Sequence, residues 1–268
     1  MKEIAIEAAL EAGNVLSSHF GKIKKIEKKD KAGLVTEVDK KAEAVVLSII
    51  SKSYPDHSFL CEESGKKENA NSDYKWIVDP LDGTTNYVHG LQFFCVSIAL
   101  EERGKVVLGV IYAPALGEFY ISEPGQGAYL YELPPFLKDP QHQYLKNPHK
   151  LQVTKTISLD DALMATGFSY RRSENITTEL ESFKKFLAQT RAIRRLGSAA
   201  LDLCYVARGI YDGYWERGLS PWDTAAAQLI VTEAGGRVTN FSGATYDYYK
   251  PDIAASNSVL HALILKNL

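Results

Sequence analysis

The chain has 268 residues, 45% of them hydrophobic, and a formal net charge of −2. This length and composition suffice for one or two packed cores, and the charge argues against a polycation that binds nucleic acid by extended phosphate neutralisation. Three cysteines without a Cys-x-x-Cys pair argue against a disulfide framework or a zinc site and favour a reducing compartment. No apolar run approaches the roughly 20 residues that a membrane span needs, and Glu3, Glu7 and Glu11 interrupt the first apolar positions, so no signal peptide is expected. We therefore expect a cytoplasmic protein that does not contact the membrane.

The first half of the chain is predicted to begin with helices and to continue with strands. Apolar residues at helical spacing predict amphipathic helices over residues 2–20 and 38–54. Short apolar runs follow, and residues 102–105 carry the signal of a hairpin turn. The strands predicted from these runs are residues 76–78, 94–100, 106–112, 119–122 and 128–131.

A proline-rich segment divides the chain. Residues 132–150 contain four prolines and few periodic apolar positions, which predicts a long surface connection. We place the boundary between an N-terminal domain, residues 1–145, and a C-terminal domain, residues 146–268. In the second domain the pattern predicts helices over residues 177–190, 198–208 and 224–234, and a strand over residues 212–216. Helices followed by strands, twice over, favour a layered α+β architecture.

A lysine-rich stretch lies between the first two predicted helices. One interpretation is a solvated strand or hairpin edge with Ile23 and Ile26 turned inward. The other is a mobile loop that leans over an anionic site. The lysines concerned are Lys22, Lys24, Lys25, Lys28, Lys29 and Lys31.

Two aspartates in the middle of the chain suggest a metal site. Asp79 ends a short apolar strand, and Asp82 lies three residues on, across a tight turn predicted from Pro80 and Gly83. Carboxylates this close repel each other unless a cation lies between them. Mg²⁺ suits such a pair because it prefers oxygen ligands, including backbone carbonyls such as that of Leu81. The alternative is an ordinary Asp-Gly turn in which Asp79 is only a cap.

The same segment suggests a phosphate site. Gly83 lets the backbone approach an anion, and N–H groups at the start of a following helix can bind phosphate oxygens. Thr84 and Thr85 follow directly. One octapeptide, residues 79–86, is therefore predicted to hold metal and phosphate together.

Two further acids have an ordinary explanation as helix caps. Ser220, Pro221 and Asp223 fit an N-cap, a proline at the first helical position and an acid at the third. Thr36 and Asp39 fit a capping box for the second helix in the same way. A capping acid can still bind a metal, so the two interpretations of Asp223 are compatible.

Four strings, in order along most of the chain, resemble signatures of the inositol monophosphatase family, and the match is nearest to its bacterial branch. The strings are Glu62–Ser64, Asp79–Asn86, Arg195–Asp202, and Trp222–Asp223 running into Val231–Gly236. The resemblance implies an αβαβα layered sandwich that is usually a homodimer. It also implies a Mg²⁺-dependent, lithium-sensitive phosphatase. One departure is the stretch 132–149, which looks longer than the corresponding family loop.

The resemblance also implies a set of metal ligands. Glu62, Asp79 and the carbonyl of Leu81 would hold a first Mg²⁺, and Asp79, Asp82 and Asp223 a second. A third, weaker Mg²⁺ near Glu62 is common in the family. Four carboxylates and a phosphate dianion carry about six negative charges, which two or three divalent ions bring close to neutrality.

Catalytic and substrate-binding roles follow from the same resemblance. Thr84 would pair with Asp39 to orient the attacking water, and the backbone N–H groups of Gly83 and Thr84 would bind phosphate. Residues expected to meet the rest of the substrate are Asp82, Gly197, Ser198, Ala199, Glu216 and Asp223.

The substrate stays open among several small phosphate monoesters. Glu216 and the run 197–199 favour a polyol, so myo-inositol monophosphate is the first substrate to expect. Relatives cleave fructose 1,6-bisphosphate, histidinol phosphate, 3′-phosphoadenosine nucleotides or NADP. A regulatory protein that binds the transcription apparatus is an alternative from another class, and the lysine-rich stretch would suit it.

Overall fold

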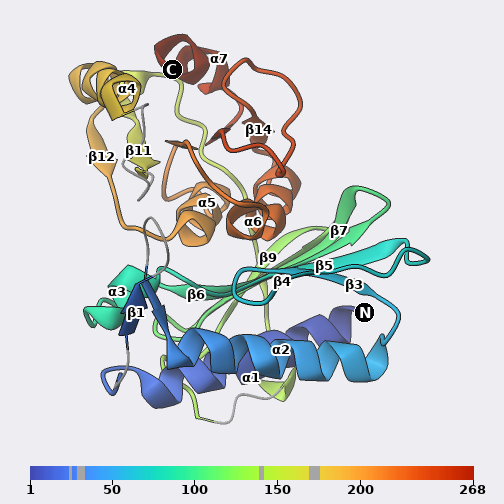
Figure 1. Cartoon of the computed structure of the whole chain (residues 1–268). Helices are drawn as coiled ribbons and strands as arrows, with labels where there is room; N and C mark the ends of the chain where they lie inside the picture. Colours follow the sequence, from blue (N-terminus) through green and yellow to red (C-terminus); the bar gives the residue numbers. More distant parts are fainter. Residues whose placement is uncertain (24–25, 29–33, 139–141, 169–175) are drawn as a thin grey trace.

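The computed structural model describes residues 1–23, 26–28, 34–138, 142–168 and 176–268, and their helices and sheets alternate in five layers (Figure 1). Helices α1 and α2 cover one face of a large sheet, and α5 and α6 cover its other face. A smaller sheet packs on the far side of α5 and α6, and α4 and α7 lie outside it. The arrangement confirms the predicted αβαβα sandwich.

The helices begin and end close to their predicted bounds. The described α-helices are α1 (Lys2–His19), α2 (Glu37–Ser53), α3 (Thr84–Val88), α4 (Ile176–Gln189), α5 (Ala199–Ala207), α6 (Pro221–Glu233) and α7 (His261–Asn267). Short 3₁₀ turns occupy His142–Tyr144 and Leu159–Asp161. Helix α7 was not predicted, and α3 was expected only as a helix start after Gly83, without bounds.

The large sheet has eight strands in the order β10-β9-β8-β7-β6-β5-β3-β4. Neighbouring strands are antiparallel except β3 and β5, which are parallel. The strands are β3 (Ser58–Cys61), β4 (Gly65–Lys67), β5 (Tyr74–Asp82), β6 (Cys95–Glu102), β7 (Lys105–Ala113), β8 (Glu118–Glu123), β9 (Gly127–Glu132) and β10 (His149–Lys150).

The second sheet has five strands in the order β12-β11-β13-β15-β14. Strand β11 is parallel to β12 and β13, whereas β15 is antiparallel to β13 and β14. The strands are β11 (Leu163–Thr166), β12 (Ala192–Arg194), β13 (Gly213–Glu216), β14 (Arg237–Thr239) and β15 (Ile253–Ser256). Only β13 was predicted, as residues 212–216.

Strand β5 does not stop where the sequence predicted. Asp79 pairs with Ser97, and Asp82 pairs with Cys95, so three steps on β5 face two on β6. This is a β-bulge, which fits Pro80 because proline has no N–H to donate to the ladder. The prediction that Asp79 ends the strand before a tight turn was therefore wrong. The bulge instead keeps both carboxylates on one continuous strand.

The hairpin that precedes α2 differs in part from its prediction. Strands β1 (Ile26–Lys28) and β2 (Leu34–Thr36) pair as a two-stranded sheet, as expected. Ile23 packs against the core under α1 and α2, but Ile26 is 50% exposed, so the inward placement of Ile26 was wrong. Lys24, Lys25, Lys29 and Lys31 lie outside the described residues.

The proline-rich segment is partly anchored to the first layer. Leu133 is buried, and the ring of Phe136 packs at 5.2 Å from that of Phe20. Strand β10 then adds an edge to the large sheet. Residues 139–141 lie outside the described part of the chain, and the predicted domain boundary at 145 remains a prediction.

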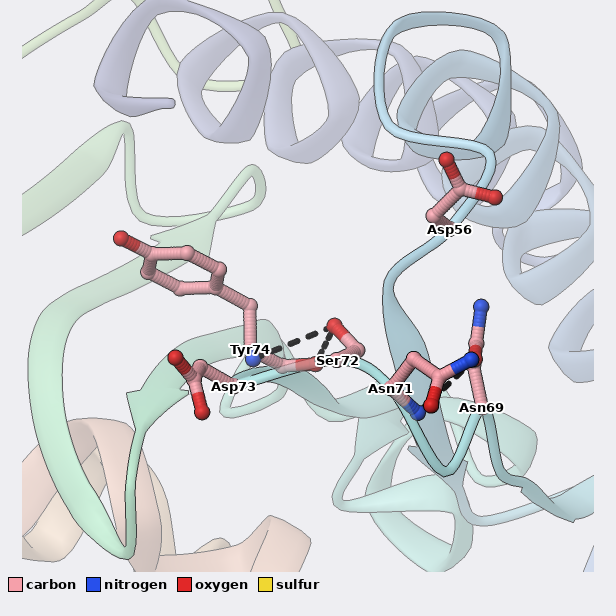
Figure 2. Close-up of a pocket in the computed structure, with 6 residues that line it drawn as sticks. All are labelled: Asp56, Asn69, Asn71, Ser72, Asp73 and Tyr74. Carbon is pink, nitrogen blue, oxygen red and sulfur yellow. Dashed lines mark hydrogen bonds between the residues drawn. The ribbon is translucent and has the colours of Figure 1, made fainter.

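A polar hollow of about 470 Å³ opens where β5 begins (Figure 2). It is lined by Asp56, Asn69, Asn71, Ser72, Asp73 and Tyr74. Tyr74 starts the strand that ends at Asp82. The hollow is therefore at the opposite end of β5 from the predicted metal site.

Candidate active site

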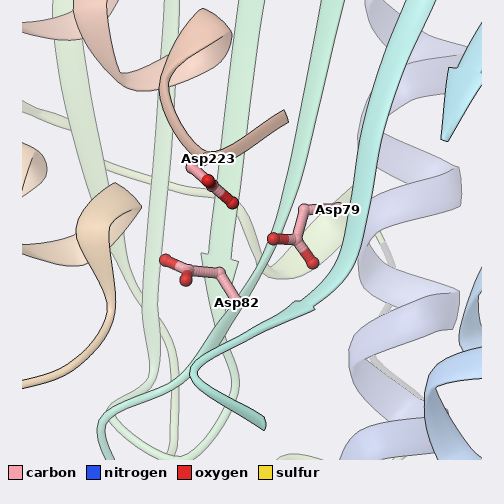
Figure 3. A group of neighbouring side chains, drawn as sticks. All are labelled: Asp79, Asp82 and Asp223. Atoms are coloured by element: carbon pink, nitrogen blue, oxygen red, sulfur yellow. The ribbon is translucent and has the colours of Figure 1, made fainter. Parts of the chain in front are cut away.

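Three carboxylates that are distant in sequence meet at the end of β5. Asp79 and Asp82 come from the bulge, and Asp223 comes from the first turn of α6 (Figure 3). One oxygen atom of each lies within 4.8 Å of the others. Sequence reasoning predicted all three as metal ligands, and the structure brings them together.

Asp223 has the capping role that its sequence context predicted. The backbone N–H of Ser220 donates a hydrogen bond of 2.7 Å to Oδ2 of Asp223, and Pro221 occupies the first helical position. This bond fixes the carboxylate at the start of α6. Helix capping and a place in the acidic cluster are thus properties of the same side chain.

The cluster is electrostatically unfavourable without a cation. Burial raises the pKa of Asp79 well above its usual value, and the charges of Glu62, Asp82 and Asp223 raise it further. The pKa of Asp223 is also raised well above its usual value, first by burial and then by Asp82. Burial raises the pKa of Asp82 to about 6, although hydrogen bonds from Ser198 and Ala200 oppose the shift. A divalent cation relieves this repulsion, and Mg²⁺ prefers oxygen ligands, so the residues fit the predicted metal.

Glu62 and Leu81, the other predicted ligands, border the cluster. The backbone N–H of Glu62 donates to the carbonyl of Val78, 3.1 Å away, next to Asp79. The N–H of Leu81 donates to Oδ1 of Asp79 at 2.9 Å, and its carbonyl accepts a 3.0 Å hydrogen bond from the hydroxyl of Thr84. Glu62 is thus held beside Asp79, and the carbonyl of Leu81 lies within reach of Thr84.

Asp39 contacts both of the partners considered for it, Thr36 and Thr84. Its Oδ2 accepts hydrogen bonds from the backbone N–H (2.9 Å) and the hydroxyl (2.6 Å) of Thr36, which completes the predicted capping box of α2. Its Oδ1 accepts a 3.1 Å hydrogen bond from the hydroxyl of Thr84. Burial raises the pKa of Asp39, and the bonds from Thr36 oppose that shift.

Gly83 has a left-handed backbone conformation, which is strained for residues other than glycine. Its φ is +92°, and it precedes the first residue of α3. A Cβ at this position would lie 2.9 Å from the carbonyl oxygen of Phe93, which is too close. Glycine is therefore needed for the chain to turn from Asp82 into Thr84.

The predicted run 197–199 lies at the start of α5 and contacts the acidic cluster through Asp82. Ser198 donates its hydroxyl to Oδ2 of Asp82 at 2.6 Å, and the N–H of Ala200 donates to the same oxygen at 2.8 Å. Gly197 has a positive φ of +85°. The side chain of Asn86 donates to the carbonyls of Leu196 and Phe93, each at 2.7 Å, and so ties this loop to α3.

Glu216 lies at the end of β13, in agreement with the strand predicted over residues 212–216. Its carboxylate accepts a hydrogen bond from the hydroxyl of Tyr214, and burial raises its pKa to about 7. The neighbouring Arg217 forms an ion pair of 3.1 Å with Asp252. A Cβ on Gly167 would lie 2.0 Å from Oε2 of Glu216, so only glycine leaves room for this carboxylate.

Three residues near the site were not singled out from the sequence as functional. Asn86 was noted only as part of a string, and Gly167 was not noted at all. Glu43 lies on α2 four residues after Asp39, and this helical spacing is a signal that would have pointed to it.

The fold and the three-carboxylate cluster agree with the family that the sequence identifies. The chain belongs to the inositol monophosphatase family, whose sequence pattern matches residues 1–268. It is 39% identical to an inositol-1-monophosphatase of Mesorhizobium japonicum over 265 residues, which cover 98% of this chain and 94% of the relative. It is 38% identical to the Nus factor SuhB of Escherichia coli over 270 residues, which cover 100% of this chain and 95% of the relative.

A solved structure agrees with this family. The extragenic suppressor protein suhB of Bartonella henselae superposes with a TM-score of 0.87 at 38% identity, covering 98% of this chain and 96% of that one. Among the described residues, no helix has the length and apolar character that a membrane crossing requires.

Proposed function

We propose that this protein hydrolyses the phosphate monoester of a small polyol, with myo-inositol monophosphate as the first substrate, and that it does so with Mg²⁺. The observation that carries the proposal is the meeting of Asp79, Asp82 and Asp223 within 4.8 Å beside the Thr84–Asp39 hydrogen bond. Membership of the inositol monophosphatase family supports phosphatase activity.

The metal would be held by the predicted ligands. Glu62, Asp79 and the carbonyl of Leu81 would form one site, and Asp79, Asp82 and Asp223 the other. Bound Mg²⁺ supplies a water of lowered pKa, a clamp on the phosphate and stabilisation of the leaving oxygen. The raised pKa values of the three aspartates support this assignment, because a divalent cation relieves the repulsion that causes part of the shift.

Thr84 and Asp39 would position the attacking water. The hydroxyl of Thr84 has one hydrogen, and when it donates to Asp39 the lone pairs of Thr84 Oγ1 are left to accept a hydrogen from water. As the water attacks, its proton passes to Thr84, and the hydroxyl proton of Thr84 passes to Asp39. The raised pKa of the buried Asp39 favours that transfer.

The remaining residues would bind the two ends of the substrate. The backbone N–H groups of Gly83 and Thr84 would bind phosphate oxygens where the chain enters α3. Glu216 would accept hydrogen bonds from substrate hydroxyls, with residues 197–199 on the same side. Because Ser198 already donates to Asp82, we assign substrate contacts in this loop chiefly to its backbone.

A phosphate-release screen with Mg²⁺ tests the proposal. The substrates are myo-inositol monophosphate, fructose 1,6-bisphosphate, histidinol phosphate, a 3′-phosphoadenosine nucleotide and NADP. We expect the highest kcat/KM on inositol monophosphate and no turnover in excess chelator. Full activity in chelator would reject the metal, and a higher kcat/KM on another ester would reassign the substrate.

A transcription role is a second candidate, favoured by the 38% identity to a Nus factor over the whole chain. Binding of the pure protein to purified bacterial RNA polymerase, or to RNA, would support it. Asp79→Asn separates the two functions, because it removes a predicted metal ligand without changing the outer surface. Absence of binding at micromolar concentrations would leave phosphatase activity as the only proposal.

A further inference from the structure

A buried carboxylate on α2 has no part in the function proposed above. Glu43 is only 3% exposed, and it lies one helical turn after Asp39. Its two oxygen atoms accept one hydrogen bond each, from the backbone N–H of Glu63 and from that of Ser64, both at 2.8 Å. Glu43 therefore holds two consecutive backbone N–H groups that lie about 20 residues further along the chain.

The gripped peptides directly follow Glu62, a predicted metal ligand. On the other side of Glu62, Cys61 pairs with Val78 in the parallel β3–β5 ladder, and the N–H of Glu62 itself donates to Val78. The backbone of Glu62 is thus held by a strand before it and by Glu43 after it. Its side chain lies close enough to Asp79 to raise the pKa of that residue.

Helix α2 therefore holds the site at two points from one face. Asp39 binds the hydroxyl of Thr84, and Glu43 binds the loop after Glu62. Burying a carboxylate is unfavourable unless hydrogen bonds compensate, so fold stability alone gives little reason to place one here. A carboxylate does what an apolar side chain cannot, because it fixes the direction of two peptide groups.

We propose that Glu43 is a positioning residue that sets the affinity of the Glu62 side of the site for Mg²⁺. The inference rests on the proposed function, since it requires Glu62 to be a metal ligand. It assigns no contact with substrate to Glu43. Supporting residues of this kind typically change metal affinity by about 10- to 100-fold when they are altered.

The test is Glu43→Gln, which keeps the size of the side chain but replaces one acceptor oxygen with an NH₂ group that faces a donor. We expect the Kd for Mg²⁺, measured by calorimetry on the substrate-free protein, to rise about tenfold or more. The rise in melting temperature caused by a fixed Mg²⁺ concentration should shrink accordingly. At saturating Mg²⁺, kcat should change by less than about threefold, because the catalytic groups are intact.

Glu233→Gln is the matched control. Glu233, at the end of α6, accepts hydrogen bonds of 2.9 Å from the backbone N–H groups of Gly125, in the turn after β8, and Gly127, the first residue of β9. It is the same kind of clamp, but none of the proposed metal ligands lies in that turn. We expect Glu233→Gln to change stability without changing the Kd for Mg²⁺.

The outcomes separate this inference from the proposed function. A wild-type protein without Mg²⁺ binding or Mg²⁺-dependent hydrolysis would reject the proposed function itself. If the wild type binds Mg²⁺ and Glu43→Gln binds it equally well, the positioning role is wrong. Should Glu43→Gln fail to fold, Glu43→Asp, which keeps the charge but cannot reach both N–H groups, replaces it under the same criteria. Failure of both variants to fold would overturn the inference by assigning Glu43 to fold stability.

Discussion

The hydroxyl of Thr84 donates a hydrogen bond of 3.1 Å to Oδ1 of Asp39, although 45 residues separate them. The other oxygen of Asp39 is occupied by the N–H and hydroxyl of Thr36. The hydroxyl of Thr84 also lies 3.0 Å from the carbonyl of Leu81, so its single hydrogen has two acceptors. Any ligand that occupies the carbonyl of Leu81 directs this hydrogen toward Asp39.

The first prediction concerns this pair. Thr84→Ala and Asp39→Asn should each lower kcat by roughly 10²- to 10⁴-fold, the usual range for a positioned proton acceptor. If the two residues act as a unit, the double variant should be little worse than either single one. Steady-state kinetics at saturating Mg²⁺ measure all three. Losses that multiply in the double variant would show that the two act independently.

Thr36→Ala is the control for the capping role of Asp39. It removes the hydroxyl partner of Asp39 in the capping box but leaves the bond to Thr84 in place. We expect a loss of about 1 kcal/mol in unfolding free energy, typical of a lost N-cap, and nearly unchanged kcat. If Asp39→Asn behaves like Thr36→Ala, Asp39 is only a cap.

The second prediction concerns the acidic cluster. Asp79→Asn removes a charge that burial, Glu62, Asp82 and Asp223 all disfavour, so the variant should be more stable than the wild type in chelator. Turnover should nearly vanish, because a ligand shared by both proposed metal sites is altered. Mg²⁺ at a hundredfold excess over its Kd should stabilise the wild type by about 2.7 kcal/mol, and the variant much less. Thermal unfolding with and without Mg²⁺ checks this, and equal stabilisation of both proteins would contradict it.

The third prediction is a pH dependence of the metal-free protein. The pKa of Asp82 is raised to about 6 in the folded state from an ordinary value of 3.8, so the folded state binds more protons than the unfolded state between these values. Its contribution to stability therefore falls as pH rises from about 4 to about 6, and it stays low above that range. In chelator, the melting temperature of the wild type relative to that of Asp82→Asn should fall between pH 4 and pH 7. An unchanged difference would show that Asp82 is not perturbed.

Mg²⁺ should reverse this trend. The cation binds the ionised carboxylates, so the gain in melting temperature on adding it should increase as pH rises through 6. Proton release on Mg²⁺ binding, measured by calorimetry in two buffers of different ionisation enthalpy, reports the same linkage. Binding without proton release at pH 5.5 would contradict the assignment of the cluster as the metal site.

Local patterns predicted the parts of this molecule that depend on neighbours in sequence. The caps at Thr36 and Ser220 and the bounds of α1 and α2 follow from hydrogen bonding and periodicity within a few residues. Strand β15 was missed because Ile253–Ser256 contains two alanines and no alternation, and its place between β13 and β14 is a tertiary pairing.

The same distinction between local patterns and tertiary contacts applies to the site. A string of eight residues indicated Asp79, Asp82 and Gly83, but the bulge that joins the aspartates depends on pairing with β6. The bond from Ser198 to Asp82 spans 116 residues, and the hydrogen bonds of Glu43 depend on how α2 packs beside β5. The packing of the layers sets the partners in contacts of this kind, so local spacing can indicate Glu43 but not the peptide groups that it binds.

The last prediction concerns substrate selection by Glu216, which lies outside the three-carboxylate cluster and accepts a hydrogen bond from Tyr214. Glu216→Gln weakens a charge-assisted hydrogen bond worth about 1.5–3 kcal/mol, so kcat/KM for inositol monophosphate should fall by about ten- to a hundredfold. Hydrolysis of p-nitrophenyl phosphate, which lacks the hydroxyls, should change little. Equal losses on both substrates would place Glu216 in support of the metal, and no loss on either would make it a bystander.

Gly167→Ala tests the same role without altering the carboxylate. The added Cβ would lie 2.0 Å from Oε2 of Glu216, so the side chain must rotate away from its present position. We expect the variant to reproduce the selective loss on inositol monophosphate. Gly236→Ala is the matched control, because its Cβ would lie 2.6 Å from a side-chain carbon of Val231, so the clash falls within the packing around α6. That control should lower stability and leave the ratio of kcat/KM values on the two substrates unchanged. If both glycine variants change the ratio equally, the effect reflects general loosening of the C-terminal layers, and the position of Glu216 does not set selectivity.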